Sequence, residues 1–519
     1  MRRSGQPDSA PDAGESAPPL THGEVRRRSS AGLFYVATSG VLNLVIAFGG
    51  SLVLARLLTP ADFGTVAVGS TVVVLATALA EGGLGSGLIR RKEAPTHREL
   101  RTLLGLQLSV TSLIAITIAA IVGGLGTTGE VVALMTLTLP ISAIQTPARV
   151  VLTRDVLLNR VAVADLTGLT ASYAWSIPTV LLGAGVWGMA SGALVRAVTT
   201  SVLLTMLSPN RFLLPSLRGV RAFGPIARFG ITFQAGWLVT VVRDQVLNLA
   251  LALLAGVGAL GQWSLARRML DGPIVPFDAI HRVTFPALSH VLSLRIDPRP
   301  LIVRIARTSA VASSLLLVPL VVSAQAIITV LFGAQWAEAG NPFSLACVAL
   351  MIGGPIAAAT FGYLGASGRP GVMLRMITVS ALAGICVSLS LLPWIGATAI
   401  GVGWIVQNVI GSLIVSRAIV DALDVNLLRS VADVYLVTVP VAMLGWAAVQ
   451  LVSPSIVETF AAGVVCFLCA FGGLLVTCRS DVFETFRTVA RSLRDALGIE
   501  SGSGSEDSVD ARVATGTNG

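Results

Sequence analysis

Ten charged side chains stand inside long apolar segments of this sequence, where burying a charge is costly. Arg243 and Asp244 adjoin in the middle of FGITFQAGWLVTVVRDQVLNLALALLAG (229–256), which carries no other charge. A charge at the centre of a membrane helix costs roughly 2.5–3.5 kcal/mol on insertion scales. The surrounding apolar residues can offset two such charges, because each contributes a few tenths of a kcal/mol. We therefore expect the segment to insert into a bilayer with Arg243 and Asp244 facing protein or water.

A second group of charges lies in SLARRMLDGPIVPFDAIHRVTFPALSH (264–290). Four of them recur at i, i+4, i+11 and i+15, which predicts one stripe along a helix: Arg267, Asp271, Asp278 and Arg282. Pro273 and Pro276 interrupt the middle, as in the broken helices that transporters place at cavities. The charges can instead neutralise one another as structural pairs, Arg267 with Asp271 and Asp278 with Arg282. His281 has a structural alternative too, as a hydrogen-bonded side chain between packed helices.

The remaining intramembrane charges are isolated. Glu81 is the only charge in TALAEGGLGSGL (77–88), and a position near a helix end is its structural alternative. Asp165 and Arg196 lie close to the ends of apolar segments, so we expect them to reach the membrane surface.

The elements that position these charges are membrane helices. Of 519 residues, 54% are hydrophobic and only 12% are charged, against roughly 25% in average soluble domains. Apolar runs of about 20 residues match the thickness of a bilayer core. Fourteen spans fit the pattern: about 33–55, 64–89, 102–125, 131–151, 163–183, 187–207, 229–255, 258–289, 305–332, 343–366, 374–393, 397–416, 433–452 and 456–478.

Basic residues alternate between the loops of this arrangement. Loops after even-numbered spans hold twenty Lys and Arg residues, whereas loops after odd-numbered spans hold one, Arg56. Cytoplasmic loops collect positive charge, so both termini are expected in the cytoplasm of a multi-pass protein. The net charge is +9, and the arginines cluster at the ends of apolar segments. Anionic membrane lipids, rather than nucleic acid, are therefore the expected partners of this charge.

Segments of the two halves resemble each other at nearly constant spacing. LLTPADFGTVAV (57–68) resembles LLAGVGALGQWSLA (253–266), with Gly64 matching Gly261, and GAGVWGM (183–189) resembles GATAIGV (396–402), with Gly183 matching Gly396. The offsets join equivalent spans six helices apart, which predicts two parallel six-helix repeats around a central cavity, plus two extra C-terminal helices.

The expected organisation is therefore all-α and membrane-integral, with seven parts. The parts are a disordered cytoplasmic tail (1–30), an N-terminal six-helix lobe (31–207), a cytoplasmic linker (208–228), a C-terminal six-helix lobe (229–420), helices 13–14 (433–478), an amphipathic interfacial helix (479–498) and a disordered tail (499–519). The amphipathic helix places seven apolar residues on one face: Val482, Phe483, Phe486, Val489, Ala490, Leu493 and Leu497. It is expected along the inner leaflet, with docking of a partner as the alternative.

Enzyme motifs are missing from the sequence. A Walker A motif needs Gly-Lys, but the only lysine, Lys92, follows Arg91. The four histidines show no metal-ligand spacing, and neither GxSxG nor HExxH occurs. We therefore predict a transporter with no catalytic residues, bound metal or cofactor.

The run LARLLTPADFGTVAVGSTVVVLATALAEGGLGSGLIRRKE (54–93) resembles the N-terminal signature of the polysaccharide transport family. This family of Wzx-type flippases belongs to the multidrug/oligosaccharidyl-lipid/polysaccharide exporter superfamily. Its Arg-x-Leu-x-Pro-x-x-[Phe/Tyr]-Gly turn corresponds to Arg56, Leu58, Pro60, Phe63 and Gly64. Its acidic or polar position before Gly-Leu-Gly corresponds to Glu81, and GALGQWSLARRM, VTFPALSHV and LFGAQWAEA also resemble family segments.

The resemblance implies a bacterial inner-membrane flippase that moves a polyprenyl-diphosphate-linked oligosaccharide by alternating access, for exopolysaccharide, capsule or other envelope glycans. It implies a monomeric transport unit, with glycan-assembly enzymes as candidate partners. An anionic diphosphate needs cationic donors, and the forked guanidinium suits phosphate. The hypothesis is that Arg243, Arg267, Arg268 and Arg282 bind the diphosphate, whereas Glu81, Asp244, Asp271 and Asp278 serve as charge partners or bind a coupling ion.

Three alternatives remain from the sequence. Many relatives have twelve helices, so the extra pair allows a lipid II-type flippase. An ion-coupled multidrug antiporter of the same superfamily predicts an acidic cavity, whereas the seventh and eighth spans carry four arginines against three aspartates. The third alternative is a membrane scaffold without transport activity.

Overall fold

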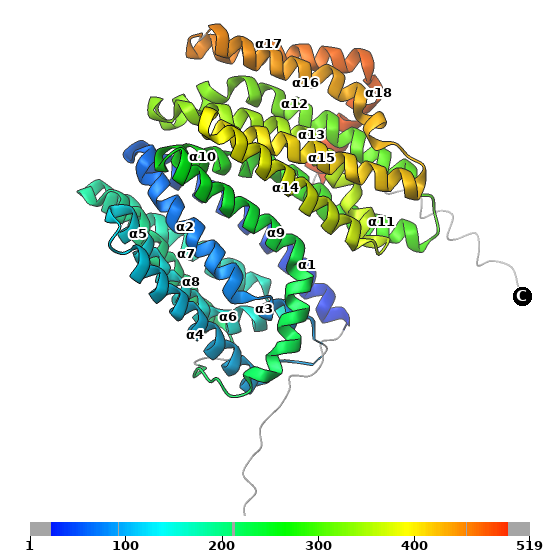
Figure 1. Ribbon diagram of the computed structural model, residues 1–519. Coiled ribbons are helices and arrows are strands. Elements are labelled where there is room, and N and C mark those ends of the chain that lie inside the picture. Colours follow the sequence, from blue (N-terminus) through cyan, green and yellow to red (C-terminus); the bar gives the residue numbers. More distant parts are fainter. Residues whose placement is uncertain (1–21, 92, 210–212, 453, 497–519) are drawn as a thin grey trace, which may run out of the picture.

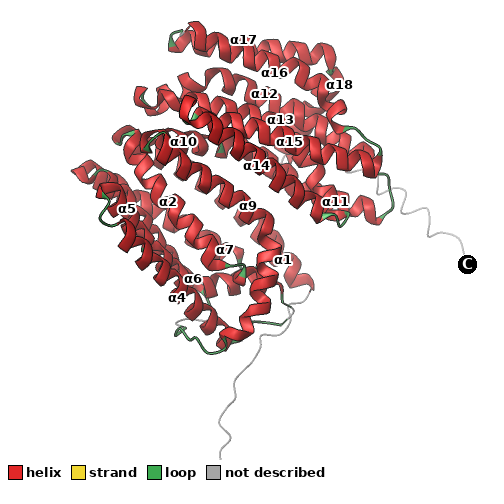
Figure 2. Cartoon of the chain, in the orientation of Figure 1, coloured by secondary structure: helices red, strands yellow, loops and turns green. Residues whose placement is uncertain are grey.

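A computed structural model describes residues 22–91, 93–209, 213–452 and 454–496 of the chain. Every regular element in these ranges is helical (Figure 2). Residues 1–21 and 497–519, which include most of both expected tails, lie outside the described ranges. The first helix begins at His22, inside the segment expected as a tail.

The described residues of the first half form eight α-helices and one π-helical turn. They are α1 (His22–Leu57), α2 (Pro60–Glu81), α3 (Leu84–Arg90), α4 (His97–Val122), α5 (Gly126–Thr136), α6 (Thr138–Arg154), α7 (Leu158–Thr179), η1 (Val180–Ala184) and α8 (Val186–Leu207). The second half forms η2 (Val220–Phe223), α9 (Gly224–Leu254), α10 (Val257–Met269), α11 (Asp271–Ser293), α12 (Arg299–Phe332), η3 (Ala334–Ala339), α13 (Gly340–Ala366), α14 (Pro370–Ile395), α15 (Thr398–Leu423), α16 (Leu427–Val452), α17 (Ile456–Thr477) and α18 (Arg479–Ala496).

Within the described residues, twelve helical segments are long and apolar enough to cross a membrane. Each of the fourteen expected spans contains helix, but two fall short of this criterion, namely 163–183 and 258–289. The first corresponds to α7, which carries Arg160 and Asp165. The second is divided between the 13-residue α10 and the charged α11. The structure thus supports a polytopic helical membrane protein with twelve candidate spans.

The expected stripe of charges in the eighth span is divided between two helices, because α10 ends at Met269 and α11 begins at Asp271, with Leu270 between them in a right-handed helical conformation (φ −73°, ψ −17°). The break precedes both prolines that were expected to cause it. Pro273 falls in the first turn of α11, where a missing N–H leaves no helical hydrogen bond unmade. Arg267 and Arg268 therefore end α10, whereas Asp271, Asp278 and Arg282 belong to α11.

The second expected span (64–89) also divides, at Gly82 and Gly83. Both glycines have positive φ (47° and 72°), a region open to glycine at little cost, so α2 ends at Glu81. At its other end, α2 begins with a capping box in which Thr59 accepts from the amide of Asp62, and Pro60 occupies the first turn.

The helices form two groups with α9 and α10 between them (Figure 1). Helices α1–α8 make up one group and α11–α18 the other. Helix α2 packs against α9 and α10, and α9 also packs against α14. The two groups therefore meet along α2, α9 and α10, which carry five of the ten intramembrane charges.

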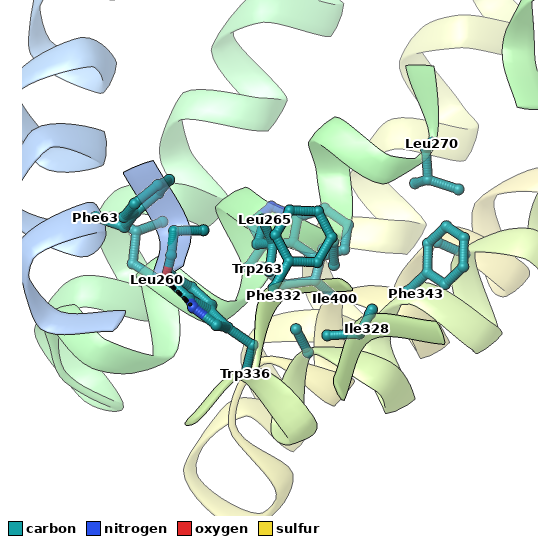
Figure 3. Close-up of a cluster of buried hydrophobic side chains, with 14 of the residues drawn as sticks. Phe63, Leu260, Trp263, Leu265, Leu270, Ile328, Phe332, Trp336, Phe343 and Ile400 are labelled. Carbon is teal, nitrogen blue, oxygen red and sulfur yellow. Dashed lines mark hydrogen bonds between the residues drawn. The ribbon is translucent and has the colours of Figure 1, made fainter. Parts of the chain in front are cut away.

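A buried aromatic cluster joins the groups at the end where the α1–α2 and α9–α10 turns lie (Figure 3). The rings of Phe63 and Trp336 meet edge to face at 5.0 Å, and the indole N–H of Trp336 donates to the Ala55 carbonyl at 2.8 Å. Arg56, from the signature turn, donates to the carbonyls of Val330 and Leu331 at 2.8 and 2.7 Å. The signature residues thus fasten the first group to the end of α12 and to η3.

At the crossing of α2 and α10 the backbones touch. A Cβ on Gly64 would lie 1.7 Å from the Val257 carbonyl oxygen, and one on Gly261 would lie 1.8 Å from that of Pro60. The contact is reciprocal, because each glycine meets the first turn of the other helix. Only glycine permits this approach.

Candidate functional site

Arg243 and Asp244, adjacent in the sequence, form an ion pair with each other. Arg243 is only 9% exposed in the middle of α9, and its Nε and Nη2 donate to Oδ1 of Asp244 at 2.8 and 2.6 Å. The guanidinium carbon also lies 5.8 Å from the centre of the Trp404 ring, a distance suited to a cation–π contact. A neighbouring carboxylate and an aromatic face thus compensate the loss of water around this buried charge.

Arg243 also borders a cavity of about 320 Å³ between α9, α11, α13, α14 and α15. Asp278 and His281 line it from α11, and Gln407 lines it from α15. Nδ1 of His281 and Oε1 of Gln407 are buried without a hydrogen-bond partner among the described residues. Buried polar atoms are normally satisfied, so water or a solute is needed there.

Arg267 forms one of the ion pairs expected from the sequence. Its Nη1 lies 3.0 Å from Oδ1 of Asp271, and its guanidinium carbon lies 5.8 Å from the Trp404 ring centre. With Asp244 and Trp404 it lines a small pocket of about 140 Å³. The Trp404 ring therefore lies within cation–π distance of two arginines, Arg243 and Arg267, each of which pairs with its own aspartate.

Arg268, the next residue along α10, faces a different space. It lines a cavity of about 770 Å³, larger than the two just described, between α1, α7 and α8 on one side and α10–α13 on the other. Arg196 of α8 lines the same cavity. Among the described residues, neither arginine has a carboxylate within ion-pair distance. We call this space the central cavity.

The walls of the central cavity are mostly apolar. Phe48 of α1, Leu169 of α7 and Phe343 of α13 line it, together with one acidic residue, Asp271 of α11. The guanidinium carbon of Arg268 lies 5.5 Å from the ring centre of Phe63. Two cations with free donors in an apolar space can bind a compact anion that carries an apolar chain.

Arg282 and Glu81 lie apart from these cavities. Arg282 is exposed on α11, and no ion pair with Asp278 forms among the described side chains. Glu81 is exposed at the last residue of α2. Of the four arginines proposed from sequence, only Arg268 faces the central cavity, whereas Arg243 and Arg267 border smaller pockets.

Another charged pair lies within the first group of helices. Arg149 of α6 donates to both oxygens of Asp165 of α7, at 2.6 and 3.1 Å. The pair borders a cavity of about 320 Å³ that Arg196 also lines. Arg196 therefore borders two cavities, and Asp165 is held by a partner rather than only by its closeness to a helix end.

Three of these functional candidates were missed by sequence reasoning. Arg196 was recognised as an intramembrane charge but set aside as lying near a span end, and Arg149 was counted as a loop residue. Trp404 sits in an apolar helix, where nothing in the sequence distinguishes a side chain that packs on two arginines from ordinary core.

Comparisons with known proteins agree with this picture. A family model described as "Polysaccharide biosynthesis protein" matches residues 53–341. "Lipopolysaccharide biosynthesis protein WzxC" of Escherichia coli (strain K12) is 22% identical over 347 residues, covering 64% of this chain and 69% of its own length. "Succinoglycan biosynthesis transport protein ExoT" of Rhizobium meliloti (strain 1021) is 25% identical over 344 residues, covering 64% and 68%.

Solved structures share the fold. The lipid II flippase MurJ in an inward closed conformation matches with a TM-score of 0.60 at 14% identity, covering 86% of this chain and 99% of its own. An inward-facing multidrug resistance MATE family transporter of the MOP superfamily matches with a TM-score of 0.53 at 16% identity, covering 74% and 99%. Both likenesses show a common helical transporter fold.

Proposed function

This chain belongs to the polysaccharide biosynthesis protein family, as a flippase-type membrane transporter, and we propose that it moves a polyprenyl-diphosphate-linked oligosaccharide across the cytoplasmic membrane by alternating access. The observation that carries the proposal is the central cavity with Arg196 and Arg268 on its walls. Arg196 belongs to α8 of the first group and Arg268 to α10 between the groups, and both line this one cavity, where we propose that they bind the anion together.

The chemistry of the cavity matches the two parts of such a substrate. A diphosphate accepts forked hydrogen bonds from guanidinium groups, and Arg196 and Arg268 have no carboxylate to compete for those donors among the described residues. The apolar walls suit the prenyl chain that follows the diphosphate. A cationic drug, by contrast, would be repelled by two uncompensated arginines, which disfavours the multidrug antiporter.

The other charged residues then take different roles. Asp244 and Asp271 remain proposed as charge partners, which their ion pairs with Arg243 and Arg267 support. Those two arginines would reach the diphosphate only by leaving their partners. Arg282 lines none of the cavities described above, so its proposed contact with the substrate has no support.

We also propose the fourteen-span topology with both termini in the cytoplasm and two parallel repeats. In this topology α7 supplies one further span and α10 with α11 another, which brings the twelve candidate spans to fourteen. Backbone geometry supports the repeats, with a small change of register. Gly185 (φ 52°, ψ −131°) and Gly396 (φ 53°, ψ −134°) have nearly the same conformation before α8 and α15, so Gly185 rather than Gly183 is the counterpart of Gly396.

The proposal can be tested by reconstituting the full chain in proteoliposomes and measuring the flipping of a fluorescent prenyl-diphosphate sugar. Arg196→Gln and Arg268→Gln should each slow flipping by about tenfold or more, since each removes a charge-assisted hydrogen bond. Arg268→Lys keeps the positive charge but not the forked guanidinium, so its flipping rate should lie between those of Arg268→Gln and the native protein.

Arg429→Gln is the matched control, because Arg429 is exposed at the start of α16 and borders none of these cavities. It should flip the probe at the native rate. Native rates for both cavity variants, with unchanged thermal stability, would refute the assigned site. A probe series that varies the sugar separates lipid II-type cargo from other lipid-linked glycans.

A further inference from the structure

Two acidic side chains of helix α18 form ion pairs with arginines of the neighbouring helix α12. Arg307 of α12 donates to Asp481 from Nε and Nη2 at 3.0 and 2.7 Å, and its Nη2 also reaches Asp433 of α16 at 2.8 Å. Glu484 pairs with Arg304 of α12. Between these residues, Val482 is only 1% exposed and packs into the protein. We call these ion pairs the α18 clamp.

The buried and exposed faces of α18 differ from those expected from the sequence. Val482 was expected on the same apolar face as Phe483 and Phe486, but it is buried, whereas the two phenylalanines are 49% and 51% exposed. Arg479 and Arg487 are exposed as well. These four residues recur at i, i+4, i+7 and i+8 and so share one outward face.

This outward face carries positive charge without negative charge. The two carboxylates among the described side chains of α18, those of Asp481 and Glu484, are taken up by the clamp on the opposite side. Arg479 is exposed, its guanidinium carbon lies 5.7 Å from the ring centre of Phe483, and it forms no ion pair with the described carboxylates. The outward face therefore combines two aromatic rings with two cations.

The same face continues an apolar surface of a membrane span. Phe486 meets Phe471 of α17 edge to face at 6.1 Å, and Phe471 stacks on Phe467 at the same distance. Helix α17 is a candidate span that ends at Thr477, two residues before α18 begins. A surface that joins a bilayer-crossing helix at its end lies at the level of the lipid headgroups.

We propose that the outward face of α18 (Arg479, Phe483, Phe486 and Arg487) binds the anionic headgroups of the adjacent membrane leaflet, and that the α18 clamp holds it in this orientation. The phenylalanines insert at the headgroup boundary, and the arginines contact the lipid phosphates. This lipid site is separate from the central cavity and does not depend on which cargo the protein carries.

The test compares hydrogen–deuterium exchange of residues 479–487 in the full-length protein in nanodiscs of two compositions. One is phosphatidylcholine alone, and the other is phosphatidylcholine mixed with phosphatidylglycerol. An arginine near an anionic surface contributes about 1 kcal/mol of binding, which makes local unfolding of α18 about fivefold less frequent. Both arginines together should therefore slow amide exchange about 25-fold in the anionic discs. High salt should reduce this difference.

Arg479→Gln with Arg487→Gln should abolish the difference between the two lipids, whereas Arg429→Gln, an exposed arginine of α16, should preserve it. Both variants change exposed side chains, and unchanged exchange in α12 and α16 reports that the bundle is intact. Equal protection of the native segment in both lipids would overturn the proposal. Protection that instead rises with protein concentration in either lipid would also overturn it, in favour of contact with a second copy of the chain.

Discussion

The reciprocal contact of Gly64 and Gly261 permits a prediction with an internal control on the same helix. Gly261→Ala adds a Cβ at 1.8 Å from the Pro60 carbonyl oxygen and 3.1 Å from the Gly64 amide nitrogen. Ordinary contact begins at 3.4 Å, so α2 and α10 must separate locally by roughly 1.6 Å. The obstacle is backbone, which cannot move aside by changing a rotamer.

The separation should cost about 2–3 kcal/mol, at the upper end of the usual range for overpacked sites. It also strains the neighbouring Phe63–Trp336 contact, which is buried at the same crossing. Gly258→Ala is the control, since a Cβ at this position of α10 meets nothing within 4 Å. It should leave stability unchanged or raise it by up to about 1 kcal/mol, because alanine favours helix over glycine.

Thermal unfolding of the purified protein, followed by intrinsic tryptophan fluorescence, measures the effect. We expect Gly261→Ala to lower Tm by about 2 °C or more and Gly258→Ala to leave it equal or slightly higher. Gly64→Ala should behave like Gly261→Ala, since the contact is reciprocal. If Gly261→Ala proved as stable as Gly258→Ala, the close crossing of α2 and α10 would be incorrect.

Three further predictions concern polar contacts that link distant helices. Arg307→Gln should lower the free energy of unfolding by about 1–3 kcal/mol, because it leaves two carboxylates unpaired, and should speed amide exchange in α18; unchanged exchange there would contradict the clamp. Trp336→Phe keeps an aromatic ring against Phe63 but loses the hydrogen bond to Ala55 and part of the buried volume, which together should cost more than about 1 kcal/mol in thermal unfolding, and no loss would argue against that bond. For Arg149 and Asp165, a double-mutant cycle with Gln and Asn should give a coupling of about 1 kcal/mol, and strict additivity would count against the pair.

The sequence predicted the features that depend on local pattern. Long apolar runs indicated membrane helices, and each expected span contains helix in the structure. The i, i+4 spacing of Arg267 and Asp271 predicted an ion pair that the structure confirms, because Leu270 keeps a helical conformation between α10 and α11 and so leaves the two residues about one turn apart. The signature around Arg56 and Pro60 predicted the family, which the family match confirms.

Helix breaks were harder to place, since the residues that cause them also occur within helices. Pro273 and Pro276 suggested a break in the middle of the eighth span, but it occurs at Leu270, before a first turn that accommodates proline. Gly82 and Gly83 could equally have continued a helix. In the structure both have positive φ values, which end α2 before them. A local pattern does not reveal which of two accessible backbone conformations the packing selects.

The roles of the arginines were decided by tertiary structure alone. Arg267 and Arg268 are identical in type and adjacent in sequence, yet one packs on Trp404 beside Asp271 and the other faces the central cavity. Helical periodicity predicts that their side chains point in different directions, but it does not predict which of the two side chains faces a cavity. That depends on helices α1, α7 and α8, which come from the other half of the chain and line the same cavity as Arg268. The sequence by itself therefore determined that charges stand within the membrane, whereas the packing of distant helices determined which of them are free to bind an anion.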